Sequence, residues 1–258
     1  MFFDLFLKSF RILLLPFALL FGAGVALRNW LYDRGWLMSA RFGLPVITVG
    51  NLSVGGTGKS PMVEYLIRLL HNKYKVATLS RGYKRKTKGY VLAGPHTTAV
   101  DIGDEPALFH QKFPHVPVAV GEERLVAIPQ LLHDRPETEV ILLDDALQHR
   151  SVAAGFNLLL TDCNNLYTRD FFLPTGDLRD QRSSSRRAQV IVVTKCPHNL
   201  SVAERDRIIA ELKPAPQQQV FFSSIQYGPV YHALTHAMGA LEPDAEVLLV
   251  TGIANPAP

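Results

Sequence analysis

Apolar runs rich in β-branched residues recur along the chain and alternate with stretches in which apolar residues return every three or four positions. The runs predict strands, and the wider spacing predicts helices that pack on them. Strands are expected near residues 45–50, 75–80, 117–120, 139–143, 156–161, 189–194, 219–223 and 246–251, and helices near 60–72, 104–113, 122–133 and 201–212. This alternation is typical of an α/β fold with a doubly wound, mainly parallel sheet.

Two of the runs are apolar at every position. Residues 140–143 read Val-Ile-Leu-Leu, and residues 190–193 read Val-Ile-Val-Val. Strands of a parallel sheet show such continuous runs when helices cover both faces of the sheet. We therefore expect these two strands to be buried on both sides.

The N-terminal segment departs from this alternation. Residues 12–27 carry no charge, lie between Arg11 and Arg28, and are flanked by phenylalanine and tryptophan side chains. As a helix they would measure about 24 Å, less than the roughly 30 Å hydrocarbon core of a bilayer, and Pro16 is expected to interrupt them. The segment is therefore marginal as a transmembrane span.

An interfacial or monotopic membrane anchor accounts for this segment best, because aromatic and arginine side chains at its ends are typical of the bilayer interface. A cleaved signal peptide is disfavoured by Asp4 and by the lack of a small-residue cleavage site. A buried helix that caps the domain is the alternative. We expect residues 1–38 to form the membrane-associated helix and residues 39–258 to form the core.

The composition is that of a large α/β domain in a reducing compartment. The 258 residues are 47% apolar, and Cys163 and Cys196 have neither a disulfide framework nor a metal-binding spacing. The net charge is only +4, but basic residues cluster within residues 81–88 and 179–187. These clusters favour an anionic substrate or a membrane surface over nucleic acid, because no nucleic-acid-binding motif accompanies them. A solvated basic face is the alternative.

The most informative motif is a glycine-rich loop between an expected strand and an expected helix, within residues 45–61. Backbone N–H groups of such a loop surround phosphate oxygens at the start of the helix. Lys59 is expected to contact the β- and γ-phosphates, and Ser60 to hold Mg²⁺. Ser53 replaces the first glycine of the usual pattern, and an ordinary glycine-rich turn is the alternative. The residues expected to bind the nucleotide are Ser53, Val54, Gly55, Gly56, Thr57, Gly58, Lys59 and Ser60.

Two adjacent carboxylates, Asp144 and Asp145, follow the apolar run 140–143. The second half of the metal site of a phosphate-loop protein belongs at such a strand end. Asp-Asp is also common in surface turns, so the motif gains its meaning from the glycine-rich loop. Gln148 and His149 follow on the same loop and are placed to contact a phosphate or a substrate hydroxyl, although a lone histidine is more often structural.

A second acidic motif is formed by Asp104 and Glu105, directly before an expected helix. In phosphoryl transfer, a carboxylate commonly accepts the proton of the attacking hydroxyl. The motif therefore predicts a general base for a hydroxyl nucleophile. The alternative is simple stabilisation of the helix N-terminus by negative charge, worth under about 1 kcal/mol.

Residues 194–197 read Thr-Lys-Cys-Pro at the end of another expected strand. GTPases with a phosphate loop carry an aspartate at the last of these positions, which pairs with guanine. Pro197 has no carboxylate for that purpose. The sequence therefore favours ATP over GTP.

These motifs together resemble the tetraacyldisaccharide 4′-kinase family, also called LpxK. The similarity runs from about residue 40 to the end of the chain, in the order of the family. The matching blocks are residues 49–61, 79–83, 103–106, 144–149, 173–179, 193–195 and 251–256. The family's phosphate loop also lacks the first glycine, so Ser53 fits it.

The resemblance implies a kinase that transfers the γ-phosphate of ATP to the 4′-hydroxyl of a tetraacyl disaccharide 1-phosphate, giving lipid IVA in lipid A biosynthesis. It implies a peripheral or monotopic location on the cytoplasmic face of the Gram-negative inner membrane. The partners are then the glycolipid and the membrane surface, with no nucleic acid and no obligate protein partner. A membrane-tethered NTPase switch that does not phosphorylate lipid is the competing hypothesis.

Carried over position by position, the resemblance implies that Lys59 and Ser60 bind ATP and Mg²⁺, and that Asp144 and Asp145 form the acid pair near the metal. It makes Asp104 the candidate base, beside a second carboxylate. The positions suited to phosphate or headgroup contacts are Arg81, Arg124, Gln148, His149 and Arg179.

The chain departs from the family pattern in two places. Ala146 stands where the family has glycine, a conservative change if the backbone there needs no positive φ. The family also has a C-terminal region with a histidine that assists the base. Because the expected strand 246–251 is followed only by a turn, we expect the chain to end before that region.

Overall fold

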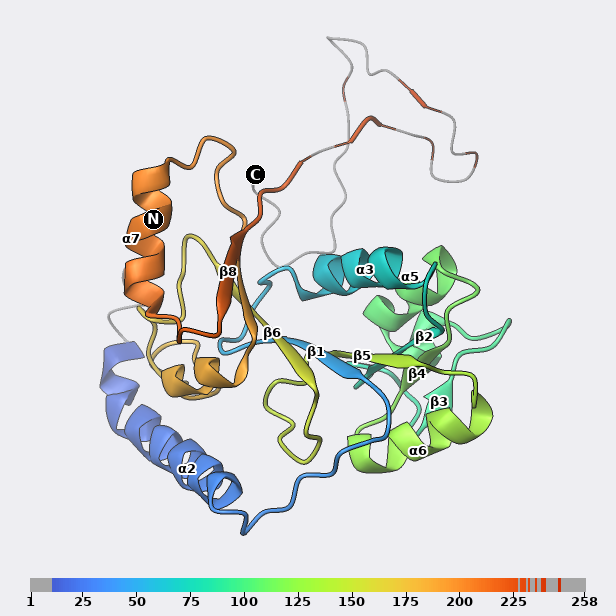
Figure 1. Ribbon diagram of the computed structural model, residues 1–258, viewed down its shortest axis with the longest axis horizontal. Helices are drawn as coiled ribbons and strands as arrows, with labels where there is room; N and C mark the ends of the chain where they lie inside the picture. The colour runs from blue at the N-terminus through green and yellow to red at the C-terminus, as the bar shows by residue number, and fades with distance from the viewer. Residues whose placement is uncertain are drawn as a thin grey trace.

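The computed structural model describes residues 11–226, 228–230, 232, 235, 238–239 and 246, and an eight-stranded sheet crosses the molecule (Figure 1). The strands are β1 (Val46–Asn51), β2 (Val76–Ser80), β3 (Val91–Leu92), β4 (Val118–Val120), β5 (Val140–Asp144), β6 (Phe156–Asp162), β7 (Val190–Thr194) and β8 (Gln219–Phe222). Their order across the sheet is β3-β4-β2-β5-β1-β6-β7-β8. Every pairing is parallel except that of β3 with β4.

The predicted strands up to residue 223 are confirmed to within about two residues at each end. The sequence did not indicate β3, because two residues are too short for a periodic pattern. The predicted strand 246–251 lies outside the described residues, apart from position 246. The mainly parallel α/β class is therefore confirmed.

Helices cover both faces of the sheet, as the continuous apolar runs predicted (Figure 1). In β5, Val140 and Leu142 pack into a cluster with side chains of α3 (Lys59–Leu70) and α5 (Asp104–Lys112). The alternate residues Ile141 and Leu143 pack into a second cluster with α6 (Arg124–Asp134) on the opposite face. The shorter α4 (Ala99–Ile102) precedes α5, and η2 (Arg182–Arg187) precedes β7.

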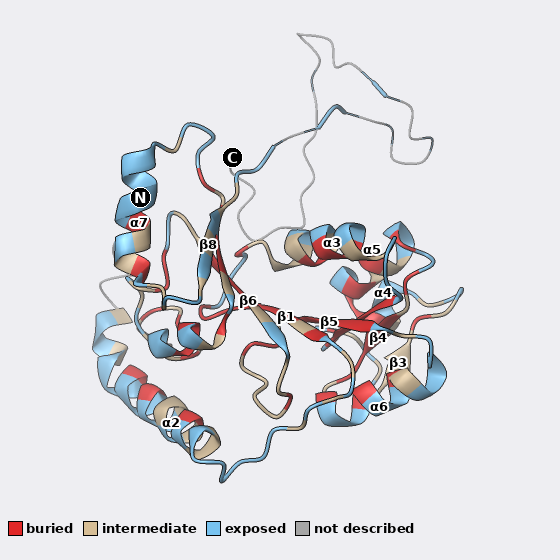
Figure 2. Ribbon diagram, viewed as in Figure 1, coloured by how far each residue is buried: buried red, intermediate tan, exposed pale blue. Residues whose placement is uncertain are grey.

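The remaining part of the core lies around β6 and β7. Leu159 and Ile191 are fully buried there and belong to one cluster with the buried Ile208 and Leu212 of α7 (Val202–Leu212). Figure 2 shows the central strands buried and the outer surface of α7 exposed.

The apolar N-terminal segment forms η1 (Ile12–Leu14) and the long helix α2 (Leu15–Asp33). The expectation that Pro16 interrupts this helix is wrong, because Pro16 lies in its first turn, where a missing N–H costs nothing. By length and composition Ile12–Asp33 could cross a membrane, with a mean hydropathy of 1.8. Most of α2 is exposed (Figure 2).

The topology brings the predicted motifs together at the carboxyl ends of the strands. β1 lies between β5 and β6, and Val49 pairs in register with Asp144. In a parallel sheet the carboxyl ends of neighbouring strands point the same way, and ligands bind beyond those ends where the direction of winding changes. The loops that follow β1 and β5 therefore lie side by side.

Candidate active site

The glycine-rich loop connects β1 directly to α3. Gly55 and Gly58 adopt positive φ angles of 111° and 82°, and Gly58 is the N-cap residue that immediately precedes α3. Glycine adopts such angles without the steric cost that a Cβ imposes. A Cβ on Gly55 or Gly56 would meet nothing within 4 Å, so the backbone there is open to a ligand. The loop thus has the local geometry of a phosphate cradle.

The side chains of the loop face the acidic motifs. Among the described residues, Lys59 Nζ makes only long contacts, at 3.4 Å to Asn51 Oδ1, 3.5 Å to the Gly55 carbonyl and 3.8 Å to Asp145 Oδ1. Ser60 Oγ donates a 2.5 Å hydrogen bond to Glu105 Oε1. The start of α5 therefore lies against the start of α3, and the two motifs that the sequence placed 45 residues apart meet.

Asp144 lies at the end of β5 and is only 3% exposed. Burial raises its pKa to about 7, and the negative charges of Glu105 and Asp145 add to this, against the attraction of Lys59 and Arg124. Its buried Oδ1 has no hydrogen-bond partner among the described residues. A buried carboxylate oxygen without a donor is energetically costly, and a cation or water would relieve it.

The neighbouring Asp145 is held differently. Its carboxylate forms a bidentate ion pair with Arg179, with Nη1 2.9 Å from Oδ2 and Nη2 bonded to Oδ1. Burial alone would raise the pKa of Asp145, but the hydrogen bonds and charge of Arg179 hold it below its ordinary value. Asp145 also adopts a positive φ of 49°, whereas Ala146 does not. The family's glycine is thus replaced at a position where alanine fits without backbone strain.

Arg124 is a buried cation at the start of α6, 2% exposed. Its Nη1 donates to the carbonyl of Gly121, while Nε and Nη2 are buried without a partner within the described part of the chain. Burial lowers its pKa to about 10, so the group stays charged at neutral pH. A buried guanidinium with free donors is suited to a phosphate or carboxylate oxygen.

Gln148 and His149 lie on the loop that follows the acid pair. Gln148 Nε2 donates to the carbonyl of Asn51 at 2.6 Å, which ties this loop to the end of β1. Burial and the positive charges of Arg124 and Arg81 lower the pKa of His149 to about 4. The imidazole is therefore neutral at pH 7, and its surroundings are electropositive.

Asp104 opens α5 and is exposed. The preceding Gly103 has a φ of 91°, and a Cβ on it would lie 2.8 Å from the carbonyl oxygen of Tyr83. The loop after β2 therefore packs directly against the residue before Asp104. This close approach requires glycine and fixes where α5 begins.

We expect Gly103→Ala to lower the free energy of unfolding by about 1–3 kcal/mol, because alanine is strained at this φ and its Cβ would clash. Thermal unfolding of the two proteins measures this. Gly43→Ala is the matched control, since Gly43 is exposed and its added Cβ would meet nothing within 4 Å. Equal free energies of unfolding for the Gly103→Ala variant and the unchanged protein would contradict the expectation.

The structure brings the predicted residues of the loop, the acid pair and the second acidic motif together. Ser53 pairs with Leu178, and the Val54 N–H donates to the Asp177 carbonyl at 2.7 Å, so the start of the loop is held by residues 177–178. Thr194 Oγ donates to the Thr57 carbonyl at 3.0 Å.

Sequence reasoning missed Asn51, which stands between several of these groups. Its Oδ1 accepts from Arg179 Nη2 at 2.5 Å and lies 3.4 Å from Lys59 Nζ. The only signal in the sequence is its place at the end of β1, immediately before the loop.

A parallel sheet whose first strand leads through a glycine-rich loop into a helix, with a buried aspartate at the end of the adjacent strand, defines a P-loop nucleotide-binding protein. Residues 10–258 match the family described as Tetraacyldisaccharide-1-P 4'-kinase, LpxK. The chain belongs to this family.

Similar proteins support this membership. The chain is 53% identical to the tetraacyldisaccharide 4'-kinase of Flavobacterium johnsoniae, over 96% of this chain and 73% of that protein. It is 48% identical to the one of Bacteroides thetaiotaomicron, over 95% of this chain and 68% of that protein. The crystal structure of LpxK from Aquifex aeolicus in complex with ATP superimposes with a TM-score of 0.67 at 31% identity, covering 83% of this chain and 81% of that one.

Proposed function

We propose that this chain transfers the γ-phosphate of ATP to the 4′-hydroxyl of tetraacyl disaccharide 1-phosphate, the reaction of its family in lipid A biosynthesis. The observation that carries the proposal is the contact of Ser60 with Glu105, which joins the phosphate loop to the acidic motif at the start of α5. The loop proposed to hold the phosphate donor and the motif proposed to hold the proton acceptor are therefore neighbours, as transfer to a hydroxyl requires.

ATP is proposed to lie along residues 53–60. The backbone N–H groups at the start of α3 and the cation of Lys59 would neutralise the phosphate charge. Arg124 has donors without a partner among the described residues and lies within electrostatic reach of Asp144, and Arg179 contacts Asn51 and Asp145. The relative from Aquifex aeolicus was solved with ATP, which supports this nucleotide.

The residues present fit Mg²⁺. This ion prefers oxygen ligands and commonly binds through one or two carboxylates plus substrate phosphates. Asp144 offers a buried oxygen to which no described residue donates, and Ser60 offers a hydroxyl on the neighbouring helix. Among the described residues, no cluster of three or more His, Cys, Asp or Glu side chains could hold a metal ion. When bound, Mg²⁺ neutralises charge on the transferring phosphate.

The proton of the acceptor hydroxyl is proposed to pass to Asp104. This carboxylate is exposed at the first position of α5, where an incoming lipid headgroup can reach it. Glu105 accepts a hydrogen bond from Ser60, a proposed ligand of Mg²⁺, so its proposed role is to support the metal site. The two neighbouring carboxylates therefore divide their roles.

The outer face of α2 is proposed to lie in the cytoplasmic leaflet of the inner membrane, as a peripheral or monotopic anchor. Phe17 and Leu20 are 61% and 71% exposed on this helix. Trp30 and Trp36 pack on each other at its C-terminal end, and Arg34 lies 5.3 Å from the Trp30 ring. Aromatic and arginine side chains at one end of an apolar helix are typical of a membrane interface.

Acceptor-dependent turnover tests the proposed function. A kinase consumes one ATP for each lipid phosphorylated, whereas an NTPase switch hydrolyses ATP without acceptor. We expect labelled phosphate from ATP to appear on tetraacyl disaccharide 1-phosphate in detergent micelles, with little release of free phosphate. ATP hydrolysis that is independent of the acceptor, with no labelled lipid, would favour the switch.

We expect Leu13→Glu combined with Leu20→Glu to reduce binding to vesicles of phosphatidylethanolamine and phosphatidylglycerol at least about tenfold, because two side chains that enter the acyl region become charged. Both side chains are exposed, so packing within the protein is retained. Flotation measures the bound fraction. Leu69→Glu on α3, a residue 54% exposed, is the matched control and should bind vesicles normally. Unchanged flotation of the double variant would contradict membrane insertion by this face.

A further inference from the structure

The inner face of α2 packs closely on the loop between β6 and β7. The buried residues of the helix are Ala18, Gly22 and Asn29, which recur at intervals of four and seven and so share one face. A Cβ on Gly22 would lie 2.7 Å from Cδ2 of Phe172, and the Phe21 ring meets the Phe172 ring edge-on at 6.2 Å. The helix is therefore fitted to this loop and is more than an appended anchor.

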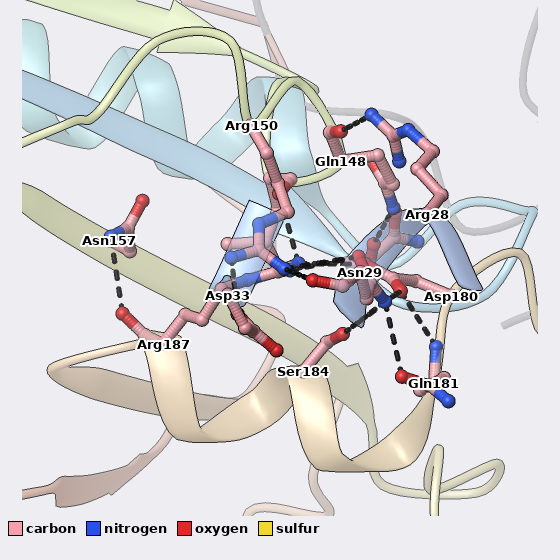
Figure 3. Close-up of polar contacts among 12 residues, drawn as sticks. Arg28, Asn29, Asp33, Gln148, Arg150, Asn157, Asp180, Gln181, Ser184 and Arg187 are labelled. Carbon is pink, nitrogen blue, oxygen red and sulfur yellow. Dashed lines mark hydrogen bonds and ion pairs between the residues drawn. The ribbon is translucent and has the colours of Figure 1, made fainter. Parts of the chain in front are cut away.

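Asn29 is a buried polar side chain on an otherwise apolar inner face, 4% exposed. Its Nδ2 donates to Asp180 Oδ1 at 2.8 Å, with longer contacts to Gln181 Oε1 at 3.2 Å and Ser184 Oγ at 3.4 Å (Figure 3). Its Oδ1 faces Arg150 Nη1 at 3.4 Å. A buried amide with this many partners fixes the register of the helix on the loop.

Asp180 is 1% exposed and is surrounded by donors. Arg187 Nη2 lies 2.7 Å from its Oδ2, and Ser184 Oγ donates to its Oδ1 at 2.9 Å. Burial would raise the pKa of Asp180, but the charge of Arg187 and the hydrogen bond from Asn29 hold it below its ordinary value. The carboxylate is therefore ionised, and its position depends on all of these partners.

The residue before Asp180 is Arg179, which pairs with Asp145 in the candidate active site. The backbone N–H groups of Arg179 and Asp180 both point to the Leu52 carbonyl, at 2.8 and 3.3 Å. A shift of the Asp180 carboxylate would move this short stretch of backbone, and with it the guanidinium that contacts Asn51 and Asp145.

The same helix also contacts the loop that follows the acid pair. Arg28 Nη2 donates to the Gln148 carbonyl at 2.6 Å, and Arg150 Nη1 donates to the Asn29 carbonyl at 2.9 Å (Figure 3). The helix α2 thus joins the two loops whose side chains, Asp145 and Arg179, form the ion pair at the phosphate loop.

We infer that Asn29 is a positioning residue of the nucleotide site: through Asp180 it holds Arg179 against Asn51 and Asp145, which makes α2 a structural part of that site. This inference rests on the proposed function only for the role of Arg179 as a phosphate contact. It predicts that a change on the inner face of α2 alters ATP binding in the absence of any membrane.

A double-mutant cycle on the affinity for ATP·Mg²⁺ tests the inference in detergent solution. Asn29→Leu keeps the γ-branched shape and the number of non-hydrogen atoms of the side chain, and it removes the donor to Asp180. We expect Asn29→Leu to weaken ATP binding about fivefold or more in the otherwise unchanged chain. When Arg179→Ala is already present, the same substitution should weaken ATP binding by less than about twofold. The reason is that the effects of two residues on affinity are not additive when one acts through the other. An equal loss in both backgrounds, or no loss in the first, would overturn the inference.

Exchanging the side chains of residues 29 and 180 distinguishes loss of this hydrogen bond from a general packing defect. Asn29→Asp combined with Asp180→Asn reverses the hydrogen bond and keeps a carboxylate near Arg150 and Arg187, whose Nη1 atoms lie 3.4 and 3.5 Å from Asn29 Oδ1. We expect the exchange to restore ATP affinity to within about threefold, whereas Asn29→Asp alone weakens it. An exchange variant that binds ATP as weakly as Asn29→Asp would count against the inference.

The control variant and the readout separate this inference from the proposed function. Asn199→Leu makes the same chemical change at an exposed position and should leave ATP affinity within about twofold. ATP binding requires no lipid acceptor. A chain that binds ATP with the expected coupling but transfers no phosphate would therefore refute the proposed function alone.

Discussion

Lys59→Ala is expected to lower the kcat of phosphate transfer by at least about 10²-fold, because it removes the cation proposed to neutralise the transferring phosphate. In the structure the ammonium group has only long contacts, the nearest at 3.4 Å to Asn51 Oδ1, so its substitution breaks no strong internal ion pair. The fold should be retained, and the loss should appear in catalysis. Transfer of labelled phosphate to the lipid acceptor measures it.

Lys73→Ala provides the matched control, since Lys73 is exposed in the turn after α3. It should leave kcat within about twofold, as surface substitutions usually do. Lys59→Arg adds a second comparison, because it keeps the charge but presents a planar fork in place of a compact point charge. Near-normal transfer by Lys59→Ala would remove the basis for placing the γ-phosphate at this loop.

The central part of the fold could be predicted because local pattern and tertiary position agree there. Residues 140–143 are apolar throughout, and in the structure the alternate side chains of β5 enter two different clusters on the two faces of the sheet. At the edge of the sheet the pattern carries less information. The two-residue β3 pairs with β4 through backbone hydrogen bonds, which no side-chain periodicity reports.

In the candidate site, too, local motifs could be predicted and tertiary contacts could not. The glycine-rich loop and the two acidic motifs could be predicted because each is a local sequence signal. The contact of Ser60 with Glu105 depends on how α3 and α5 pack across one face of the sheet. The pair of Asn29 and Asp180 spans 151 residues of sequence, and no local signal in either segment indicates that the two side chains meet. Such contacts follow from tertiary packing and could not be read from one sequence.

The N-terminal helix illustrates how position changes the meaning of a residue. Pro16 was expected to interrupt the apolar segment because proline removes a hydrogen bond within a helix. In the first turn of α2 that hydrogen bond does not exist, and the helix continues to Asp33. Helix ends are set by capping and by tertiary contacts, which composition alone does not define.

Asp104→Asn is expected to lower kcat by about 10²- to 10⁴-fold while the affinity for ATP·Mg²⁺ stays within about twofold. A general base acts on the acceptor hydroxyl in the transition state, and the amide of asparagine cannot accept the proton. The side chain of Asp104 is exposed and nearly isosteric with asparagine, so the start of α5 and its close contact with the loop after β2 are retained.

Comparison with Glu105→Gln makes this prediction specific. Glu105 accepts the hydrogen bond from Ser60, so its substitution should weaken ATP·Mg²⁺ binding, whereas Asp104→Asn should spare it. Asp206→Asn, on the exposed face of α7, is the matched control and should leave both quantities unchanged. Steady-state kinetics in detergent micelles, with ATP affinity measured separately, distinguishes the variants. Full kcat in Asp104→Asn would exclude it as the base, and a loss confined to ATP affinity would assign it to the metal side of the site, beside Glu105.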